Sequence, residues 1–203
     1  MSFFYWLLIG AGAWFVAVAL KITGDVLFQR NTTVDFHDWV TGVLSGLWAS
    51  VIELGLASIA FLIWCATVWD AVGYALGAAA VEFMLLLPVA FSGGVSTEKK
   101  RRGSKEPASV MTWRNFAIER VLAVIGHIAS RVLVWIGVAG TGGFLAFAAA
   151  FGLYTLAEGL AAYGEAKDWN WQSPRVMWPF LIVQTVIVAV TVWLAIWWSG
   201  VFA

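Results

Sequence analysis

The chain has 203 residues, of which 62% are hydrophobic and only 12% are charged, and its 12 basic and 12 acidic residues give a formal net charge of zero. Soluble domains carry roughly 25% charged residues, so this composition excludes an ordinary soluble protein. The mean hydropathy of +0.85 indicates an integral membrane protein. The one cysteine excludes an internal disulfide.

Hydropathy and turn residues divide the chain into six apolar segments, each close to the about 20 residues that a transmembrane helix needs. They are expected at about 3–23, 40–66, 70–92, 115–139, 142–164 and 176–200. No A-x-A-like cleavage site follows the first segment, so we expect a retained span and not a signal peptide. The predicted fold class is all-α: a polytopic bundle of six transmembrane helices in a single domain, residues 1–203.

The basic residues indicate the orientation. Nearly all of them fall in three longer connections, 24–39, 93–114 and 165–175, and none in the two tight hairpins near 66–70 and 140–143. The positive-inside rule therefore places the three longer loops in the cytoplasm and both termini outside. The run KKRRGSK at 99–105 is a topology signal, with anionic-lipid binding as an addition. This single short loop beside the bilayer gives no support to nucleic-acid binding.

Runs of small residues predict where helices approach closely. These runs are GYALGAAAV at 73–81 and GFLAFAAAFG at 143–152. Small side chains let helix backbones come together in membranes. We therefore expect a compact bundle of segments three to five.

Ionisable residues near the middle of the spans point to a functional site. Glu53, Glu82 and His127 lie near the centres of three different segments. Each such group costs at least about 2.5 kcal/mol to place at mid-bilayer, so three of them are not expected by chance. The fourth segment also carries a polar helical face, spaced at i, i+4 and i+7. That face holds Glu119, Ala123, Gly126, His127, Ser130 and Arg131, with Arg120 at its border.

Depth along the helices, at 1.5 Å per residue, suggests partners for the charges. Asp70 at the outer end of the third segment is expected to pair with Arg131, and Glu158 matches the depth of Arg120. Salt bridges then account for the two arginines.

The remaining group, Glu53, Glu82, His127 and Tyr154, lies near the midplane, where carboxylates outnumber the available cations. Such carboxylates must be protonated, or must share a proton or a metal. One imidazole with two or three carboxylates suits zinc or another divalent metal, and it suits a proton-binding cluster equally well.

The order of these motifs resembles the YhfC family of intramembrane metalloproteases, related to the PrsW and CAAX-protease-like membrane families. The stretch ERVLAVIGHIASRVLVW at 119–135 is similar to that family's Glu-Arg followed by a His seven residues later. YTLAEGLAAYG resembles its His-x-x-x-Asp helix, with Tyr154 and Glu158 in the His and Asp positions. GYALGAAAVEF resembles its Gly-rich helix ending in Glu, without the usual His, and VIELGLA at 51–57 keeps one Glu of a Glu-Glu motif.

This resemblance, which covers about 40–165, implies roles for individual residues. Metal-activated water would attack a peptide bond, with Glu53 or Glu82 as general base and Glu119 and Arg120 in the catalytic set. Glu82 and His127 would hold one divalent, zinc-like metal together with Glu53 or Glu158, with Tyr154 assisting. Because several metal-ligand histidines of the family are replaced, the resemblance equally implies a relative that has lost catalysis.

Three functions follow, and the sequence leaves all three open. A divergent intramembrane hydrolase requires Glu82 and His127 to face each other and a wet cavity. A non-catalytic bundle that binds another membrane protein or peptide requires mutually paired polar residues in a dry core and an apolar or small-residue groove that stays open to lipid. A transporter of protons or small solutes requires a polar path from Glu119 through His127 to Arg131. Motifs of soluble enzymes are absent. The expected location is a prokaryotic plasma membrane, with lipids and another membrane protein or peptide as partners.

Overall fold

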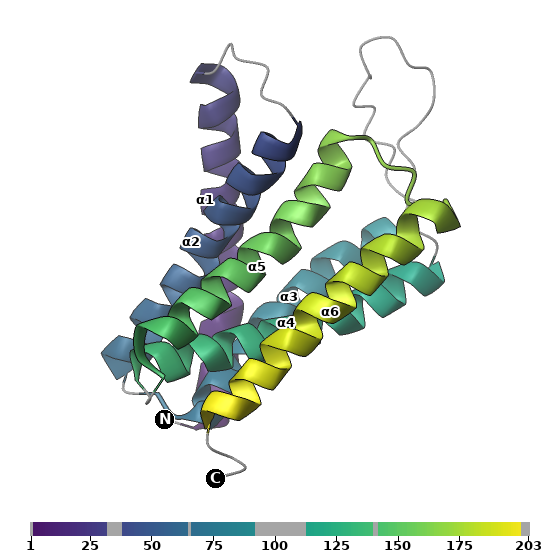
Figure 1. The fold of residues 1–203 in the computed structure, drawn as a ribbon. Coiled ribbons are helices and arrows are strands. Elements are labelled where there is room, and N and C mark those ends of the chain that lie inside the picture. Colours follow the sequence, from purple (N-terminus) through teal and green to yellow (C-terminus); the bar gives the residue numbers. More distant parts are fainter. Residues whose placement is uncertain (1, 32–37, 65, 92–112, 140–141, 200–203) are drawn as a thin grey trace.

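The computed structural model describes residues 2–31, 38–64, 66–91, 113–139 and 142–199 (Figure 1). These residues form six α-helices and, within the described ranges, no strand. Each helix is long and apolar enough to cross a membrane. The chain is therefore an all-α, multi-pass membrane protein, as its sequence predicts. The helices are α1 (Phe3–Asn31), α2 (Asp38–Trp64), α3 (Val68–Phe91), α4 (Trp113–Val138), α5 (Gly143–Ala166) and α6 (Pro174–Ser199).

The predicted spans agree with the helices to within two residues at nearly every end, but α1 is longer than expected. Its apolar part covers Phe3–Gly24, close to the predicted 3–23, whereas the helix continues to Asn31. The added sequence, DVLFQRN, is more polar but contains no proline or glycine that would end a helix. Hydropathy therefore marks the end of the span and not the end of the helix.

Successive helices alternate in direction, so the first residues of α1 and the last residues of α6 lie at the same end of the bundle (Figure 1). This matches the prediction that both termini share one side. The assignment of that side to the exterior stays a prediction, because the KKRRGSK run lies outside the described residues.

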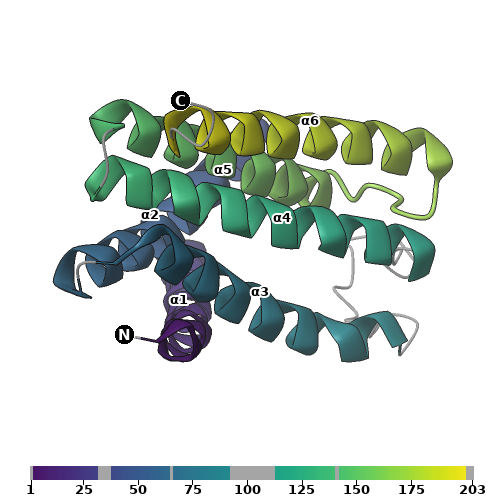
Figure 2. The same cartoon turned by 90° about the horizontal axis from the view of Figure 1, so that it is seen from below.

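Helix α4 is the centre of the second half of the bundle. It contacts α3, α5 and α6, and Figure 2 shows it running between α3 and α6. The C-terminal half of α4 is packed with apolar side chains, since Leu133, Val134 and Ile136 are almost completely buried. The indole nitrogen of Trp135 donates a 2.6 Å hydrogen bond to the carbonyl oxygen of Ala66, which links α4 to the connection between α2 and α3.

Glycines allow α1 to cross α3 at close range. A Cβ atom added at Gly77 would lie 1.9 Å from the carbonyl oxygen of Leu7, and one added at Gly10 would lie 1.9 Å from that of Tyr74. The glycines of the run at 73–81 therefore pack on α1, a contact that the sequence analysis did not expect, while α3 also contacts α4 and α4 contacts α5 as it did expect. The sequence shows where small residues lie but not which helix they contact.

A second close crossing joins α2 to α5. An added Cβ at Gly46 would lie 2.3 Å from the carbonyl oxygen of Thr155, and one at Gly42 would lie 2.8 Å from that of Gly159. Gly159 lies outside the small-residue run at 143–152, which instead approaches α4: an added Cβ at Gly137 would lie 2.8 Å from the Phe147 nitrogen. The two glycine crossings bring α1 close to α3 and α2 close to α5.

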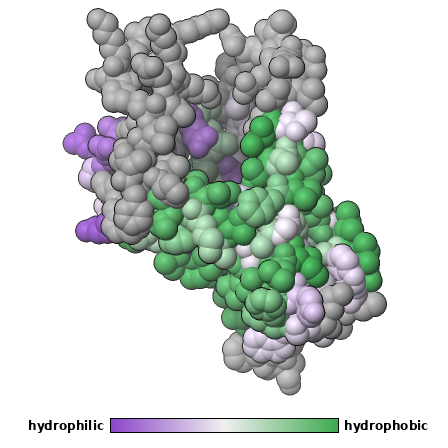
Figure 3. Space-filling model, turned by 180° about the vertical axis from the view of Figure 1, so that it is seen from behind, coloured by the Kyte–Doolittle hydropathy of each residue, from purple (hydrophilic) through white to green (hydrophobic). Residues whose placement is uncertain are grey.

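The outer surface is largely hydrophobic, as a lipid-facing surface must be. Exposed large apolar residues occur on every helix. Figure 3 shows hydrophobic residues over most of the visible face, with hydrophilic atoms set in a hollow between its two arms. The polar residues of the spans are thus gathered inside, and they form the candidate site.

Candidate functional site

Glu53 is the centre of the first polar cluster. This α2 side chain is only 5% exposed, and it reaches residues of α1, α4 and α5. Its Oε2 accepts hydrogen bonds of 2.5 Å from Arg131 Nη2 and from the Tyr154 hydroxyl, and its Oε1 forms an ion pair with Lys21. The Arg131 guanidinium also lies 4.7 Å from the centre of the Tyr154 ring. One carboxylate therefore connects four helices.

Glu82 is the centre of the second cluster. Its Oε1 lies 2.5 Å from Arg120 Nη1, and its Oε2 lies 2.9 Å from His127 Nε2. Arg120 turns its remaining nitrogens to Glu119, with Nε 2.5 Å from Glu119 Oε2. The cluster joins α3 to α4 and leaves neither oxygen of Glu82 without a partner.

The two clusters touch through His127 and Tyr154. Their rings meet edge to face, with centroids 5.9 Å apart. The structure thus brings together Glu53, Glu82, His127 and Tyr154, as the depth estimate placed them. His127 Nδ1 is buried and has no hydrogen-bond partner among the described residues.

The expectation that the midplane carboxylates outnumber the available cations is wrong for Glu53 and Glu82, which share three basic partners. Arg131 and Lys21 both reach Glu53, and Arg120 reaches Glu82. Sequence reasoning missed Lys21 because it treated this residue as the end of the first span. The signal was present, since the sequence after Lys21 continues without a proline and places the lysine inside α1.

The expected pair between Asp70 and Arg131 is also wrong. Asp70 instead caps the start of α3: its Oδ2 accepts hydrogen bonds from the Thr67 amide at 2.7 Å and from the Thr67 hydroxyl at 2.8 Å. A Thr followed three residues later by an acid is the capping-box pattern. Depth alone could not distinguish the two possibilities, because it says nothing about the direction in which a side chain leaves its helix.

The predicted match between Glu158 and Arg120 fails for the same reason. Arg120 binds Glu82 and Glu119. Glu158 forms no hydrogen bond or ion pair with any of the described residues, and it lies against a cavity.

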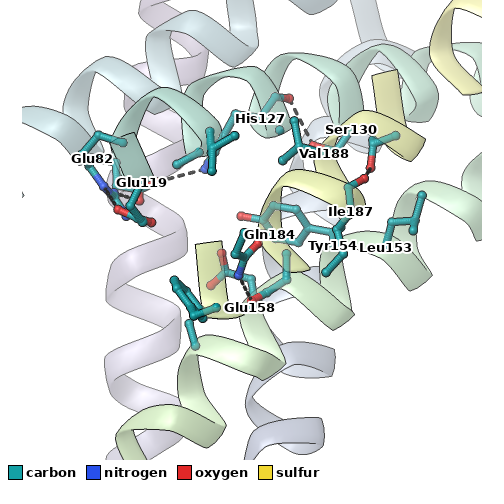
Figure 4. A pocket seen from close by; sticks show the side chains of 18 residues that line it. Glu82, Glu119, His127, Ser130, Leu153, Tyr154, Glu158, Gln184, Ile187 and Val188 are labelled. Atoms are coloured by element: carbon teal, nitrogen blue, oxygen red, sulfur yellow. Dashed lines mark hydrogen bonds and ion pairs between the residues drawn. The ribbon is translucent and has the colours of Figure 1, made fainter. Parts of the chain in front are cut away.

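This cavity, of about 170 Å³, lies between α4, α5 and α6, with Glu82 of α3 at its border (Figure 4). Its α6 wall repeats at helical spacing, from Phe180 through Gln184 and Val188 to Thr191. Gln184 Nε2 donates a 2.9 Å hydrogen bond to the carbonyl oxygen of Ala157 on α5. Charged and polar lining residues are Glu82, Glu119, Arg120, His127, Ser130, Tyr154, Glu158, Gln184 and Thr191, and the others are apolar.

The residues present do not fit a metal. Within the described ranges, no group of three His, Cys, Asp or Glu side chains could hold an ion. Glu82 and His127 are within contact distance, but they use Oε2 and Nε2 on each other and Arg120 occupies Oε1. Glu158 does not complete a trio with them. The zinc-like metal expected from the sequence therefore stays a prediction that this donor set does not support.

A polar path across the whole membrane is not seen in the described part of the bundle. Polar contacts run from Glu119 through Arg120 and Glu82 to His127, and Ser130 hydrogen bonds both the His127 carbonyl and Arg131. Beyond Arg131, α4 continues with buried Val132, Leu133 and Val134. The chain of polar contacts therefore ends before the C-terminal end of α4.

No protein-family model, curated protein or solved structure matches this chain. The resemblance to the YhfC family stays a prediction from the order of its motifs.

Proposed function

We propose that this chain is a non-catalytic binding protein of a prokaryotic plasma membrane, which holds one group of another membrane protein or peptide in the cavity between α4, α5 and α6. The observation that carries this proposal is the pairing of the central carboxylates. Both oxygens of Glu53 and both oxygens of Glu82 already contact basic groups of the same chain. The ion pairs hold the helices together, and the cavity beside them remains open.

The pairing argues against catalysis by these carboxylates. A general base must reach the proton that it removes with a free lone pair. Glu82 has Arg120 on one oxygen and His127 on the other, while Glu53 is enclosed by Lys21, Arg131 and Tyr154. These basic partners stabilise the ionised form of each carboxylate, which makes both glutamates weak bases toward a water molecule.

The cavity supports a small guest. Sites for drug-sized ligands measure about 300–1,000 Å³, whereas this cavity measures about 170 Å³. Its mixed lining suits a group with an apolar stem and a polar end, such as one long side chain of a membrane-spanning segment. This agrees with the partner expected from the sequence.

Photo-crosslinking in native membranes tests the proposal. A diazirine-bearing analogue of leucine at Leu153 faces the cavity, and the same analogue at Leu156, which is 60% exposed on the same helix, is the control. We expect Leu153 to give an adduct that maps to one membrane segment of a second protein, and Leu156 to give mainly lipid adducts. The adduct should disappear in Ala157→Phe, which fills the cavity. Lipid or self adducts alone at both positions would refute the proposal.

A hydrolase is the second candidate, because Glu82 and His127 face each other beside the cavity as that hypothesis requires. The motif positions of the YhfC resemblance also gather around this site. Under this alternative, partner peptides captured at Leu153 would carry new termini, and Glu82→Gln would abolish the cleavage. Intact partner peptides in both the wild type and Glu82→Gln would favour binding without catalysis.

A further inference from the structure

Glu158 differs from the other acidic residues of the site. Glu53, Glu82 and Glu119 each contact a basic side chain. Glu158 lines the cavity and forms no hydrogen bond or ion pair with the described residues. A carboxylate inside a membrane protein ordinarily pairs with another group, so a missing partner is the feature to explain.

The charge balance of the site points to the missing group. Its acidic side chains are Glu53, Glu82, Glu119 and Glu158, and its basic side chains are Lys21, Arg120 and Arg131. Each of these three basic side chains, all of them in the described part of the chain, contacts Glu53, Glu82 or Glu119, and none of them contacts Glu158. One added cation at Glu158 would give this fourth carboxylate a partner.

The atoms around Glu158 are suited to accept hydrogen bonds. Gln184 uses its Nε2 on the carbonyl oxygen of Ala157, the residue next to Glu158, so its carbonyl oxygen remains to accept. The Tyr154 hydroxyl is already used, because it donates to Glu53 and lies beside the Arg131 guanidinium. Figure 4 shows Glu158, Gln184 and Tyr154 around the same part of the cavity. The carboxylate and the Gln184 carbonyl oxygen together suit a cation with several N–H groups.

The depth of the site suits a side chain with an aliphatic stem. At 1.5 Å per residue, Glu158 lies about 12 Å from the end of α5 and Phe180 about 9 Å from the start of α6. Apolar residues of all three helices border the cavity between its polar groups, among them Leu122, Ala161 and Phe180. An aliphatic chain can pack on these residues while its charged end reaches Glu158.

We infer that the cavity binds an N–H-bearing organic cation, the ammonium of a lysine or the guanidinium of an arginine in the partner's membrane segment, with Glu158 as its counter-ion. This inference rests on the proposed function, because it names the group that the partner supplies. Gln184 accepts a further N–H group. Arg120 and Arg131 are already committed to acidic partners, and Lys21, whose charge also acts on Glu158, forms its ion pair with Glu53.

Direct binding of small probes to the purified full chain in detergent tests the inference. The probes are hexylammonium, hexylguanidinium, neutral hexanol and hexyltrimethylammonium, which lacks N–H groups, and the measurement is a titration followed by ligand-observed NMR. We expect the first two to bind about tenfold or more tightly than hexanol, because a hydrogen bond to a charged group corresponds to roughly a ten- to hundredfold change in affinity. Hexyltrimethylammonium should bind less well than hexylammonium. Equal binding of hexanol and hexylammonium would overturn the inference, since a protonated Glu158 would not select a cation.

Variants locate the binding. Glu158→Gln should remove the preference for hexylammonium over hexanol, whereas Glu165→Gln, the same change on the same helix outside the cavity lining, should keep it. An unchanged preference in Glu158→Gln would overturn the inference. If Glu158→Gln does not fold, Ala161→Phe, which fills the cavity, must abolish binding of both cations, and binding that persists would refute the site.

The two proposals can fail separately. Cation-selective binding without a peptide adduct at Leu153 would leave the cation site standing, with a free amine as its ligand, and would refute the partner. A peptide adduct without cation selectivity would keep the binding protein and refute the role of Glu158.

Discussion

Both sides of helix α5 carry small residues, but one side is tightly packed and the other borders a cavity. On one side, Thr155 and Gly159 press against α2 so closely that Gly46 has no room for a Cβ atom. On the other side, Tyr154, Ala157 and Glu158 border a cavity of about 170 Å³ toward α4 and α6. Small residues therefore do not by themselves predict tight packing. What decides is whether the facing helix also offers small residues, as α2 does with Gly42 and Gly46.

The bundle thus has a tightly packed side and a cavity on the two sides of one helix. The packed side is supported by backbone contacts and by a 2.8 Å hydrogen bond between Ser50 and Thr155. The cavity side is bordered by ion pairs that join α4 to α2 and α3. We expect the ion pairs, the glycine crossings, the hydroxyl pair and the cavity to contribute to stability in that order.

The largest effect is expected for Arg131→Met. This change leaves Glu53 buried with one basic partner fewer, and breaking a buried ion pair on one side costs about 3–5 kcal/mol. The free energy of unfolding in mixed micelles, measured by titration with SDS, checks it. Arg175→Met, at an exposed position of α6, is the control and should change stability by less than about 0.5 kcal/mol.

A double variant sharpens this result. Combining Glu53→Gln with Arg131→Met removes both charges of the buried pair and leaves only the partly exposed Lys21 without its partner, so it should cost less than the sum of the two single variants. If the double variant is as unstable as the sum of the two single variants, Glu53 and Arg131 do not act as a pair.

The next effect concerns the packed side of α5. Gly46→Ala places a Cβ atom 2.3 Å from the Thr155 carbonyl oxygen and should force α2 and α5 apart, at a cost of about 1–3 kcal/mol. Gly55→Ala on the same helix meets nothing within 4 Å, so it should be neutral or stabilising by up to about 1 kcal/mol. Thermal unfolding of both variants in detergent checks the difference. Equal melting temperatures would mean that the α2–α5 crossing is looser than described.

A smaller effect is expected for the hydroxyl pair. Ser50→Ala removes the bond to Thr155 between two helices, and hydrogen bonds of this kind contribute about 0.6 kcal/mol and at most about 1.7 kcal/mol in membrane proteins. Ser58→Ala is the matched control, because its hydroxyl binds the Leu54 carbonyl of its own helix. The same SDS titration should show a larger loss for Ser50→Ala, and a larger loss for Ser58→Ala would contradict the assignment.

The smallest effect, with the opposite sign, is expected on the cavity side. Ala157→Leu adds methyl groups toward empty space and should be neutral or stabilising by about 0.5–2 kcal/mol. The same change at Ala150, which is fully buried on α5, should destabilise by overpacking. Melting temperatures of the pair check this, and a similar loss at both positions would show that the cavity closes in the membrane.

Much of the fold could be predicted, because an apolar run of about 20 residues specifies a membrane helix almost alone. Five of the six helices begin and end close to the expected residues. Helix α1 was predicted too short because a hydropathy criterion stops where the chain leaves the apolar layer. The packing of α3 on α1 could not be predicted, since no sequence signal states which helix Gly77 meets.

The sequence predicted which central residues meet in the site, but it did not predict which of them form ion pairs. Helical spacing and depth indicated that Glu53, Glu82, His127 and Tyr154 would meet, and the structure brings them together. Pairing depends on the rotation of each helix about its axis, which depth does not contain. Asp70 therefore caps α3 in place of binding Arg131, and Lys21 joined the site without being expected. The catalytic and metal-binding roles suggested by the family resemblance stay predictions.

The double pairing of Glu53 has a consequence for how the protein is made. Lys21 precedes Glu53 by 32 residues, whereas Arg131 follows it by 78 residues, so the two partners enter the membrane at different stages of synthesis. Each charge alone at the centre of a helix opposes insertion by about 2.5–3.5 kcal/mol. Helices α1 and α2 can enter together with Glu53 already paired to Lys21, before α4 is made. The order of charges along the chain therefore suits its insertion helix by helix.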